Sequence, residues 1–418
     1  MRKEIPAAHS EAVHTKCCGI SISFQENHLI PDTLSRTEHR MRVIFCTVSE
    51  SMIIHTEDDF DLDKIADSGQ CFRWETSVKE SGGVPVYEES GADRAFDKPH
   101  GQSESDPRQD PETNNSPGKT GSRLPVYRIL AGSRCLYISA LGNGRFDLDC
   151  TDGEFEEFWR DYFDLGESYR SIRERIDPVK DPFLMNAAQY EKGIRILRQD
   201  PWETLLSFII SQNKNIPAIR RSIGLLCEAC GDQRTDSLGK PYYAFPGPEA
   251  VASLSADDLN ACRLGYRSAY VRAAAEAVLE GRLDLKELMR LGEDSDKEKN
   301  KGEGNDEDKE KNRGKEKDED CIISTLTGLY GVGIKVASCT ALFGLHRLDA
   351  FPVDVWMKRI LAAEYPDGYP REEYAPYNGV YQQYMFAYYR HMIDHARSHP
   401  CEISKKSRIV THKTGFSK

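Results

Sequence analysis

Residues 326–339 read LTGLYGVGIKVASC and hold the most informative local pattern in the chain. An apolar helical segment ends before a tight turn that contains Gly331 and Gly333, and a second apolar helix follows. Glycine lets a backbone turn sharply and approach another group closely. The amides at the start of the second helix, at the positive end of its dipole, can then meet a phosphate oxygen. The pattern predicts a helix-hairpin-helix that holds a DNA backbone without reading bases, although the triplet alone also fits a simple packing turn.

Lys335 lies two residues after Gly333, in the first turn of the second helix. A lysine at a helix start lies at the positive end of the helix dipole, which favours the neutral amine, and a neutral amine is a nucleophile. The residue alone would equally fit a surface lysine or a phosphate contact. A catalytic role for Lys335 therefore needs a second group that completes the site.

Asp354 is the second candidate group. It lies in the segment FPVDVWM (351–357), directly before a helical run from Val355 to Ala363, and this position predicts an N-cap. Most N-cap aspartates have only a structural role. A carboxylate in an apolar setting, with a lysine on a neighbouring helix, is nevertheless the arrangement expected of a catalytic pair.

Length and composition restrict the number of domains and the class of protein. The chain has 418 residues, of which 39% are hydrophobic and 30% charged, and its mean hydropathy is -0.60. These values fit two domains accompanied by polar segments. The chain has no apolar run of about 18 residues, so we expect no membrane span. The 12 cysteines follow no framework spacing, and we expect them to be reduced thiols.

The net charge of -12 at first argues against a nucleic-acid partner. Two polar segments, residues 80–122 and 293–320, each carry a net charge of -5, and the rest of the chain is close to neutral. The last 17 residues contain five basic residues and one acidic residue. Overall acidity therefore does not exclude DNA as a partner.

The patterning changes along the chain from strand-like to helical. We predict a weakly ordered extension at residues 1–45 and an antiparallel sheet domain at 46–150, interrupted by a polar insertion at 76–122. A helical domain follows at 151–399, with a second polar insertion at 293–320, and a basic tail at 400–418. Asp200 before Pro201 marks a helix start. Further helices are predicted at 218–230, 257–262, 270–281 and 283–291. The predicted fold class is α+β, with an all-α helix-hairpin-helix domain after the sheet.

Three further motifs occur in order along the chain: SGQCFRW at 68–74, LRQDPW at 197–202 and SQNKNI at 211–216. Together with GVGIKVA and PVDV, they resemble the helix-hairpin-helix superfamily of DNA glycosylases. Within it the chain is similar to 8-oxoguanine DNA glycosylase/AP lyases over roughly 55–75, 123–292 and 321–395. Ala218 occupies the position at which the eukaryotic members have an arginine that reads the opposite cytosine, so the resemblance implies a looser opposite-base preference. Trp356 replaces a histidine often found after the Asp-Val pair and favours a bacterial-type variant.

The resemblance implies a base-excision repair enzyme. Such enzymes flip the damaged nucleotide out of the duplex. By resemblance, the Lys335 amine attacks C1′ of the sugar and forms a Schiff base, Asp354 stabilises the positive charge on the sugar, and β-elimination nicks the strand. The implied partner is duplex DNA containing 8-oxoguanine, and no cofactor or metal is expected. We expect a monomer, in the cytoplasm of a bacterium or the nucleus of a eukaryote.

The resemblance also implies which residues hold the base. Gly69 matches a glycine whose carbonyl accepts a hydrogen bond from N7–H of 8-oxoguanine. Phe386 and Cys339 match residues that stack on the two faces of the base. Gln382 matches the residue that reads the Watson–Crick edge, and the neighbouring Gln383 leaves an ambiguity of one residue.

Other matched positions face the duplex. Asn213, Tyr266 and Arg267 match residues that fill the vacated stack and contact the orphaned cytosine. Gly331 and Gly333 match the hairpin glycines that approach the phosphates.

Two alternatives remain open at this stage. The chain could be a related glycosylase for another damaged base, although alkylpurine enzymes of this superfamily generally lack the lysine. It could also be a helix-hairpin-helix DNA-binding module without catalysis, which the pairing of Lys335 with Asp354 argues against. The CEAC segment at 227–230 has no second cysteine pair nearby, so we do not expect zinc there.

Overall fold

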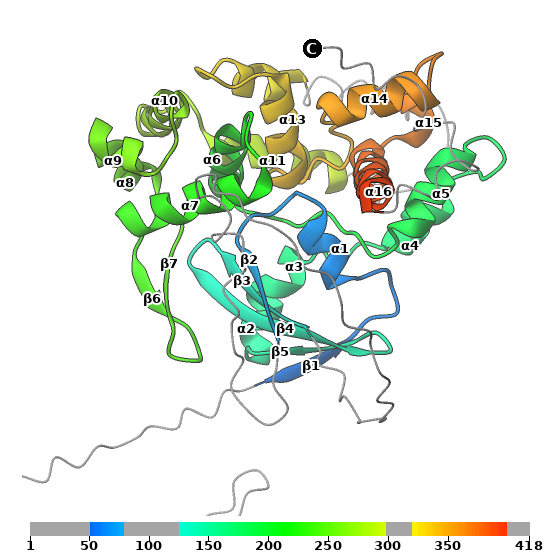
Figure 1. Cartoon of the computed structure of the whole chain (residues 1–418), viewed down its shortest axis with the longest axis horizontal. Coiled ribbons are helices and arrows are strands. Elements are labelled where there is room, and N and C mark those ends of the chain that lie inside the picture. The colour runs from blue at the N-terminus through cyan, green and yellow to red at the C-terminus, as the bar shows by residue number, and fades with distance from the viewer. Residues whose placement is uncertain (1–50, 79–124, 298–319, 399–418) are drawn as a thin grey trace, which may run out of the picture. The chain divides into compact units, whose positions relative to one another are not determined.

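The computed structural model describes residues 51–78, 125–297 and 320–398 (Figure 1). Five strands form one antiparallel sheet in the order β1-β5-β4-β3-β2. Their bounds are β1 Met52–His55, β2 Trp74–Val78, β3 Pro125–Ala131, β4 Arg134–Gly142 and β5 Arg145–Leu148. The sequence prediction of an antiparallel sheet followed by helices is confirmed.

The segment between β1 and β2 differs from the sequence prediction, which placed strands throughout it. Helix α1 (Leu62–Asp67) occupies its middle. The Asp61 side chain caps α1 by accepting a hydrogen bond from the amide of Lys64. Leu62 and Ile65, three residues apart, are buried on one face, so the apolar period there is helical.

The predicted insertion at 76–122 begins too early. β2 continues to Val78, because its register with β3 runs to the pair Val78–Pro125. The remainder of the insertion lies outside the described residues, as do the predicted extension at 1–45 and the basic tail at 400–418.

Helices make up most of the chain after β5. Residues 320–327 are helical, and the other helices have these bounds: α2 Asp152–Glu154, the π-helical turn η2 Phe155–Trp159, α3 Arg160–Tyr162, α4 Tyr169–Glu174, α5 Pro182–Tyr190, α6 Pro201–Ser211, α7 Ile216–Cys230, α8 Pro248–Ser253, α9 Ala256–Ala261, α10 Arg267–Leu279, α11 Leu285–Lys297, α13 Ile334–Phe343, α14 Val355–Glu364, α15 Arg371–Tyr374 and α16 Asn378–Ser398. The four helices predicted above correspond to α7, α9, α10 and α11. None of the described helices is both long and apolar enough to cross a lipid bilayer.

Two details of the helical part correct the sequence prediction. α11 continues to Lys297, five residues into the predicted insertion at 293–320, because helix propagation is easy once a helix is nucleated. The part after α7 also contains a two-stranded hairpin, β6 (Gln233–Thr235) and β7 (Pro241–Tyr243), so the domain is not all-α. Asp236 in this hairpin accepts hydrogen bonds from Arg128 and Tyr137 of the sheet, and these contacts explain why the hairpin forms.

The first helical turns after β5 pack against the sheet and share its hydrophobic core. The side chains of Phe155, Trp159, Tyr162 and Phe163 are buried in one cluster with strand residues such as Ile129. Trp159 and Phe163 stack with ring centroids 6.1 Å apart. The core of the sheet therefore extends beyond residue 150, where the sequence prediction placed the start of the helical domain.

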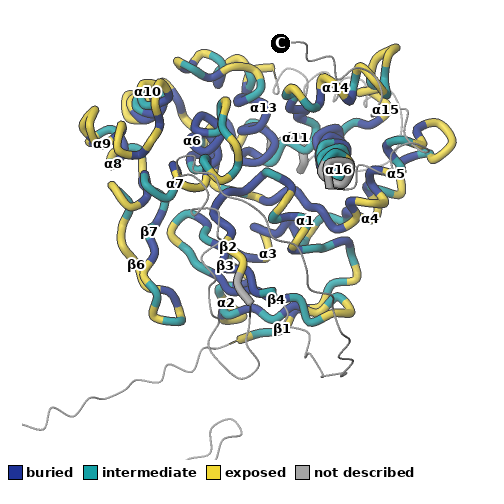
Figure 2. Tube along the Cα trace, viewed as in Figure 1, coloured by how far each residue is buried: buried dark blue, intermediate teal, exposed yellow. Residues whose placement is uncertain are grey.

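A second, larger core lies among the helices. Nine of the eleven residues of α6 are buried, and every residue of α13 from Val336 to Phe343 is buried (Figure 2). Asp200 caps α6 as predicted, since its side chain accepts a hydrogen bond from the amide of Glu203 at 2.8 Å. α6 and α13 pack on each other and form the scaffold for the candidate site described below.

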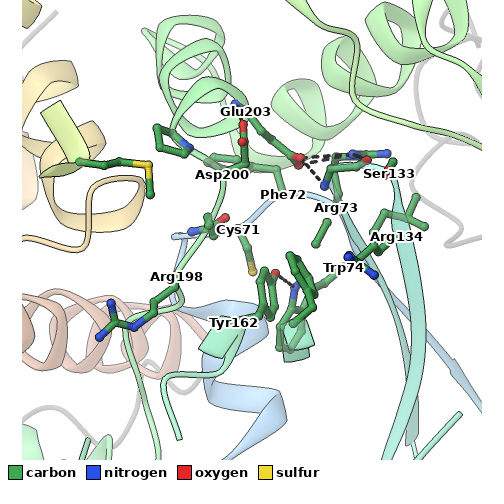
Figure 3. Close-up of a pocket in the computed structure, with 17 residues that line it drawn as sticks. Cys71, Phe72, Arg73, Trp74, Ser133, Arg134, Tyr162, Arg198, Asp200 and Glu203 are labelled. Atoms are coloured by element: carbon green, nitrogen blue, oxygen red, sulfur yellow. Dashed lines mark hydrogen bonds and ion pairs between the residues drawn. The ribbon is translucent and has the colours of Figure 1, made fainter. Parts of the chain in front are cut away.

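A cavity of about 380 Å³ lies beside the contact between the sheet and α6 (Figure 3). At its wall, the Arg73 guanidinium and the Glu203 carboxylate form a buried ion pair with an N–O distance of 3.4 Å. Glu203 also accepts a hydrogen bond from the amide of Gly132 at 2.9 Å. Burial raises the pKa of Glu203, and the charge of Arg73 opposes this effect. The pair joins the strand β2 region to the helical core.

We predict that Arg73→Met lowers the free energy of unfolding by about 3–5 kcal/mol, because it leaves a buried carboxylate without its cation. Thermal or urea unfolding measures the change. The control is Arg134→Met, which breaks an exposed ion pair with Glu157 and should cost less than about 1 kcal/mol. Equal losses in the two variants would contradict the role given to the buried pair.

Candidate active site

The predicted hairpin lies between the helical residues 320–327 and α13. Gly331 has a φ of +82°, and a Cβ atom there would lie 2.1 Å from the ring of Tyr270. Only glycine fits this position, because the backbone is left-handed and packs directly on an aromatic ring. The Gln212 side chain donates a hydrogen bond to the Gly331 carbonyl at 3.1 Å. Gly333 is exposed and is the N-cap residue of α13, so the first amides of that helix follow it.

Lys335 lies in the first turn of α13 and is half-buried. Its Nζ atom lies 4.8 Å from the ring centroid of Phe208 on α6. Cys339, one turn further along α13, is buried, and this burial raises the pKa of its thiol. The positive charge of Lys335 and a hydrogen bond from it act in the opposite direction. The amine is therefore held between an aromatic ring and a thiol.

Asp354 is the N-cap of α14, as the sequence predicts. Its Oδ1 atom accepts a hydrogen bond from the amide of Met357 at 2.8 Å. The carboxylate is half-buried, and its charge contributes to the raised pKa of Cys339. The charges of Lys335 and Asp354 thus both influence the pKa of the Cys339 thiol, in opposite directions.

The turn that follows α1 presents Gly69 with a φ of +82°. Its neighbours are fixed by buried polar contacts: Ser68 Oγ donates to the Ile65 carbonyl, and Gln70 Nε2 donates to Ser68 Oγ and to the Arg195 carbonyl. These bonds leave the turn little freedom. The turn is built to hold one backbone geometry.

Gly69 and Phe386 are brought together, as the resemblance implies. A Cβ atom on Gly69 would lie 3.6 Å from Cε1 of Phe386 on α16 and 3.7 Å from Nη1 of Arg390. Phe386 is only partly buried, whereas most of its neighbours on α16 are buried. One edge of the predicted base site is therefore formed by this turn and by α16.

The structure bears on the ambiguity between Gln382 and Gln383. Gln383 Nε2 donates to the Ser68 carbonyl and so helps to hold the Gly69 turn. Gln382 is also buried, and its Oε1 atom has no hydrogen-bond partner among the described residues. An unpaired buried amide oxygen is costly and suits a ligand donor. The geometry favours Gln382 as the residue that reads the base.

The residues predicted to face the duplex cluster around the hairpin. Asn213 is exposed with a φ of +51°, and Tyr266 is 55% exposed. Arg267 is buried; its guanidinium donates to the carbonyls of Gln212 and Asn213 and lies 4.3 Å from the Tyr266 ring. In this structure Arg267 thus holds the Asn213 loop, and its predicted contact with cytosine stays a prediction.

Two aromatic rings connect the two halves of the site. Phe208, on which the Lys335 amine lies, meets Phe72 edge to face with centroids 5.6 Å apart. Phe72 follows Gly69 by three residues, so the Lys335 amine and the Gly69 turn are connected through one aromatic contact. An amine, a carboxylate and an aromatic ring in this order can expel a base from a sugar and stabilise the resulting cation. In the part of the chain that the structure describes, no three metal-ligating side chains gather into a site.

Sequence reasoning missed four residues that hold these groups: Phe208, Gln212, Tyr270 and Arg390. Phe208 and Tyr270 carried no signal beyond helical core periodicity. Arg390 could have been found, since it lies four residues after Phe386 and shares its helix face.

Comparisons with known proteins show which family the chain resembles. The family described as 8-oxoguanine DNA glycosylase, N-terminal domain, matches residues 107–205, and the family described as HhH-GPD superfamily base excision DNA repair protein matches residues 206–366. The structure of MBOgg1 in complex with a low-affinity DNA ligand is 30% identical, with a TM-score of 0.60 over 82% of this chain and 96% of that chain.

Two further relatives extend the comparison. The Clostridium acetobutylicum 8-oxoguanine glycosylase/lyase, in complex with double-stranded DNA containing cytosine opposite 8-oxoguanine, is 27% identical, with a TM-score of 0.58 over 82% of this chain and 98% of that chain. The N-glycosylase/DNA lyase of Saccharomyces cerevisiae is 34% identical over 181 residues, which are 42% of each protein. The match thus spans about two fifths of the yeast protein. Because the relatives include a bacterium and a yeast, the bacterial-type assignment stays a prediction.

We predict that Gly331→Ala lowers the free energy of unfolding by about 2–4 kcal/mol, because the methyl group meets the Tyr270 ring on a left-handed backbone. Gly333→Ala is the matched control: its φ is -94° and a Cβ atom there meets nothing within 4 Å, so stability should change by less than about 0.5 kcal/mol. Differential scanning calorimetry of both variants checks this. Equal stability would show that the hairpin tolerates any residue at position 331.

Proposed function

The chain belongs to the 8-oxoguanine DNA glycosylases of the HhH-GPD superfamily, and we propose that it excises 8-oxoguanine from duplex DNA and then cleaves the abasic strand. The observation that carries the proposal is the half-buried Lys335 amine in the first turn of α13, 4.8 Å from the Phe208 ring centroid, together with the Asp354 carboxylate at the N-cap of α14. The resemblance of the sequence motifs and the family matches both support this activity.

The reaction follows from the groups present. The Lys335 amine forms a bond to C1′ while the bond from C1′ to N9 of the base breaks, and the base leaves with a proton. C1′ is then bonded to the lysine nitrogen and to the ring oxygen O4′. Cleavage of the C1′–O4′ bond opens the sugar to a Schiff base, which acidifies the C2′ proton. Loss of that proton breaks the bond from C3′ to the 3′ phosphate oxygen and nicks the strand. The amine is then released by hydrolysis of the imine.

Asp354 faces the positive charge that grows on the sugar as the base departs. A carboxylate held by the N-terminus of α14 is fixed before the reaction begins, so little energy is spent on reorienting it. The same cap holds the helix in place. The group therefore has both a structural and an electrostatic part in the proposed reaction.

The duplex would lie across the hairpin. In this proposal the amides that follow Gly333, at the start of α13, bind phosphate oxygens, and the exposed Tyr266 and Asn213 fill the gap left by an extruded nucleotide. We also propose that the enzyme acts as a monomer.

We predict that borohydride traps a covalent complex between the protein and an 8-oxoguanine duplex, and that Lys335→Gln abolishes trapping. The matched control is Lys214→Gln. Lys214 is the other lysine near the DNA-facing loop; burial lowers its pKa, but its Nζ atom donates to Ser222 and to the Arg263 carbonyl. Lys214→Gln should still be trapped.

The outcome also separates the alternatives. Trapping on another damaged base, with none on 8-oxoguanine, would indicate a glycosylase of different specificity. Binding of duplex DNA without any trapping would indicate a non-catalytic module. Persistent trapping of Lys335→Gln would place the nucleophile elsewhere.

We predict that Asp354→Asn slows excision on the order of 100-fold, comparable with the loss of one preorganised electrostatic group. Asparagine caps helices as well as aspartate does, so the fold should be retained. Single-turnover excision and thermal unfolding, measured on the same preparation, test this. A variant that unfolds like the wild type and also excises at the wild-type rate would remove the carboxylate from the mechanism.

A further inference from the structure

We propose that Arg390 is a specificity-determining residue of the base site, which donates a hydrogen bond to the C8 oxygen of the extruded base while the Gly69 carbonyl accepts from N7–H. The inference rests on the proposed function. It is carried by the position of the guanidinium, which lies beside Gly69 and against Phe386.

The guanidinium is close to both predicted base contacts. Nη1 of Arg390 lies 3.7 Å from the position of a Cβ atom on Gly69, and its Cζ lies 5.9 Å from the ring centroid of Phe386. Arg390 follows Phe386 by four residues on α16, so the two side chains share one helix face. A base that stacks on Phe386 and reaches the Gly69 carbonyl therefore meets Arg390 at its edge.

One terminal nitrogen of the Arg390 guanidinium is hydrogen-bonded, and the other is available to a ligand. Nη2 donates to Asp67 Oδ2 at 2.8 Å, at the end of α1 and two residues before Gly69. Nη1 has no hydrogen-bond partner among the described residues. The arginine side chain is only 20% exposed. A planar guanidinium fixed at one nitrogen presents the other in a defined direction.

Asp67 is itself held by His391, which is held in turn by Glu191. His391 Nε2 lies 3.1 Å from Asp67 Oδ2, and His391 Nδ1 lies 2.7 Å from Oε1 of Glu191. Glu191 is fully buried at the end of α5, and burial raises its pKa while His391 opposes this. The chain from Glu191 through His391 and Asp67 to Arg390 thus connects α5, α16 and α1 at the Gly69 turn.

The chemistry of the lesion matches this pair of groups. 8-Oxoguanine carries a donor at N7 and an acceptor at C8, side by side on one edge of the five-membered ring. Guanine carries an acceptor at N7 and a C–H group at C8. A carbonyl next to a charged donor pairs with both groups of the lesion, whereas with guanine both would stay unpaired in a desolvated site. Arg390 would therefore add discrimination that Gly69 alone cannot supply.

The test separates base recognition from the later chemistry. Single-turnover excision of 8-oxoguanine is compared with β-elimination on a duplex that already contains an abasic site, where no base has to be read. We expect Arg390→Met to lose excision by about tenfold or more and to keep β-elimination within about twofold. Arg390→Lys, which keeps a charged donor, should recover part of the loss. Asp67→Asn, which releases the guanidinium, should change excision in the same direction by a smaller factor.

The control is Glu373→Gln, which breaks an exposed ion pair with Lys180 and should change neither step. Wild-type excision by Arg390→Met would overturn the inference. Equal losses in both steps would also overturn it, because they would indicate a role in folding or in DNA binding. If the wild-type protein cleaves abasic duplexes but excises no 8-oxoguanine, the proposed function fails together with the inference.

Discussion

The burial of α13 is the constraint on which the candidate site depends. Every residue of this helix after Lys335 is buried, so the helix axis and its first turn are fixed by packing on α6. The one long polar side chain at its start must then lie along the surface of that core, over Phe208 and next to Cys339. An amine placed in this way is covered on one side by the protein and keeps its other side accessible to a substrate. The hairpin that precedes it is fixed in turn by the contact of Gly331 with Tyr270.

The two cores supply different parts of the candidate site. The helical core supplies the amine, the carboxylate and the amides at the start of α13. The segment attached to the sheet supplies the Gly69 turn, and α16 supplies Phe386 and Arg390. The buried pair of Arg73 and Glu203 and the ring contact of Phe72 with Phe208 keep the sheet region in register with α6. A base would therefore be read by one part of the chain and released by another.

Features set by local chemistry could be predicted from the sequence, and features set by distant contacts could not. The caps at Asp200 and Asp354 and the hairpin glycines need only a few neighbouring residues, and the structure has them where the sequence placed them. The extension of β2 to Val78 depends on pairing with β3, across a long intervening segment. The role of Arg267 as a brace of the Asn213 loop likewise depends on a carbonyl far away in sequence. Family resemblance pointed to Gly69 and Phe386, but the partner that they share, Arg390, became visible only in three dimensions.

In the proposed reaction the Nζ atom of Lys335 becomes bonded to C1′ of the sugar. Peptide mass mapping of the protein after reduction with borohydride on an 8-oxoguanine duplex tests this directly. The account predicts the deoxyribose adduct on the peptide that contains Lys335. An adduct on the peptide that contains Lys214, or on any other amine of the chain, would contradict it.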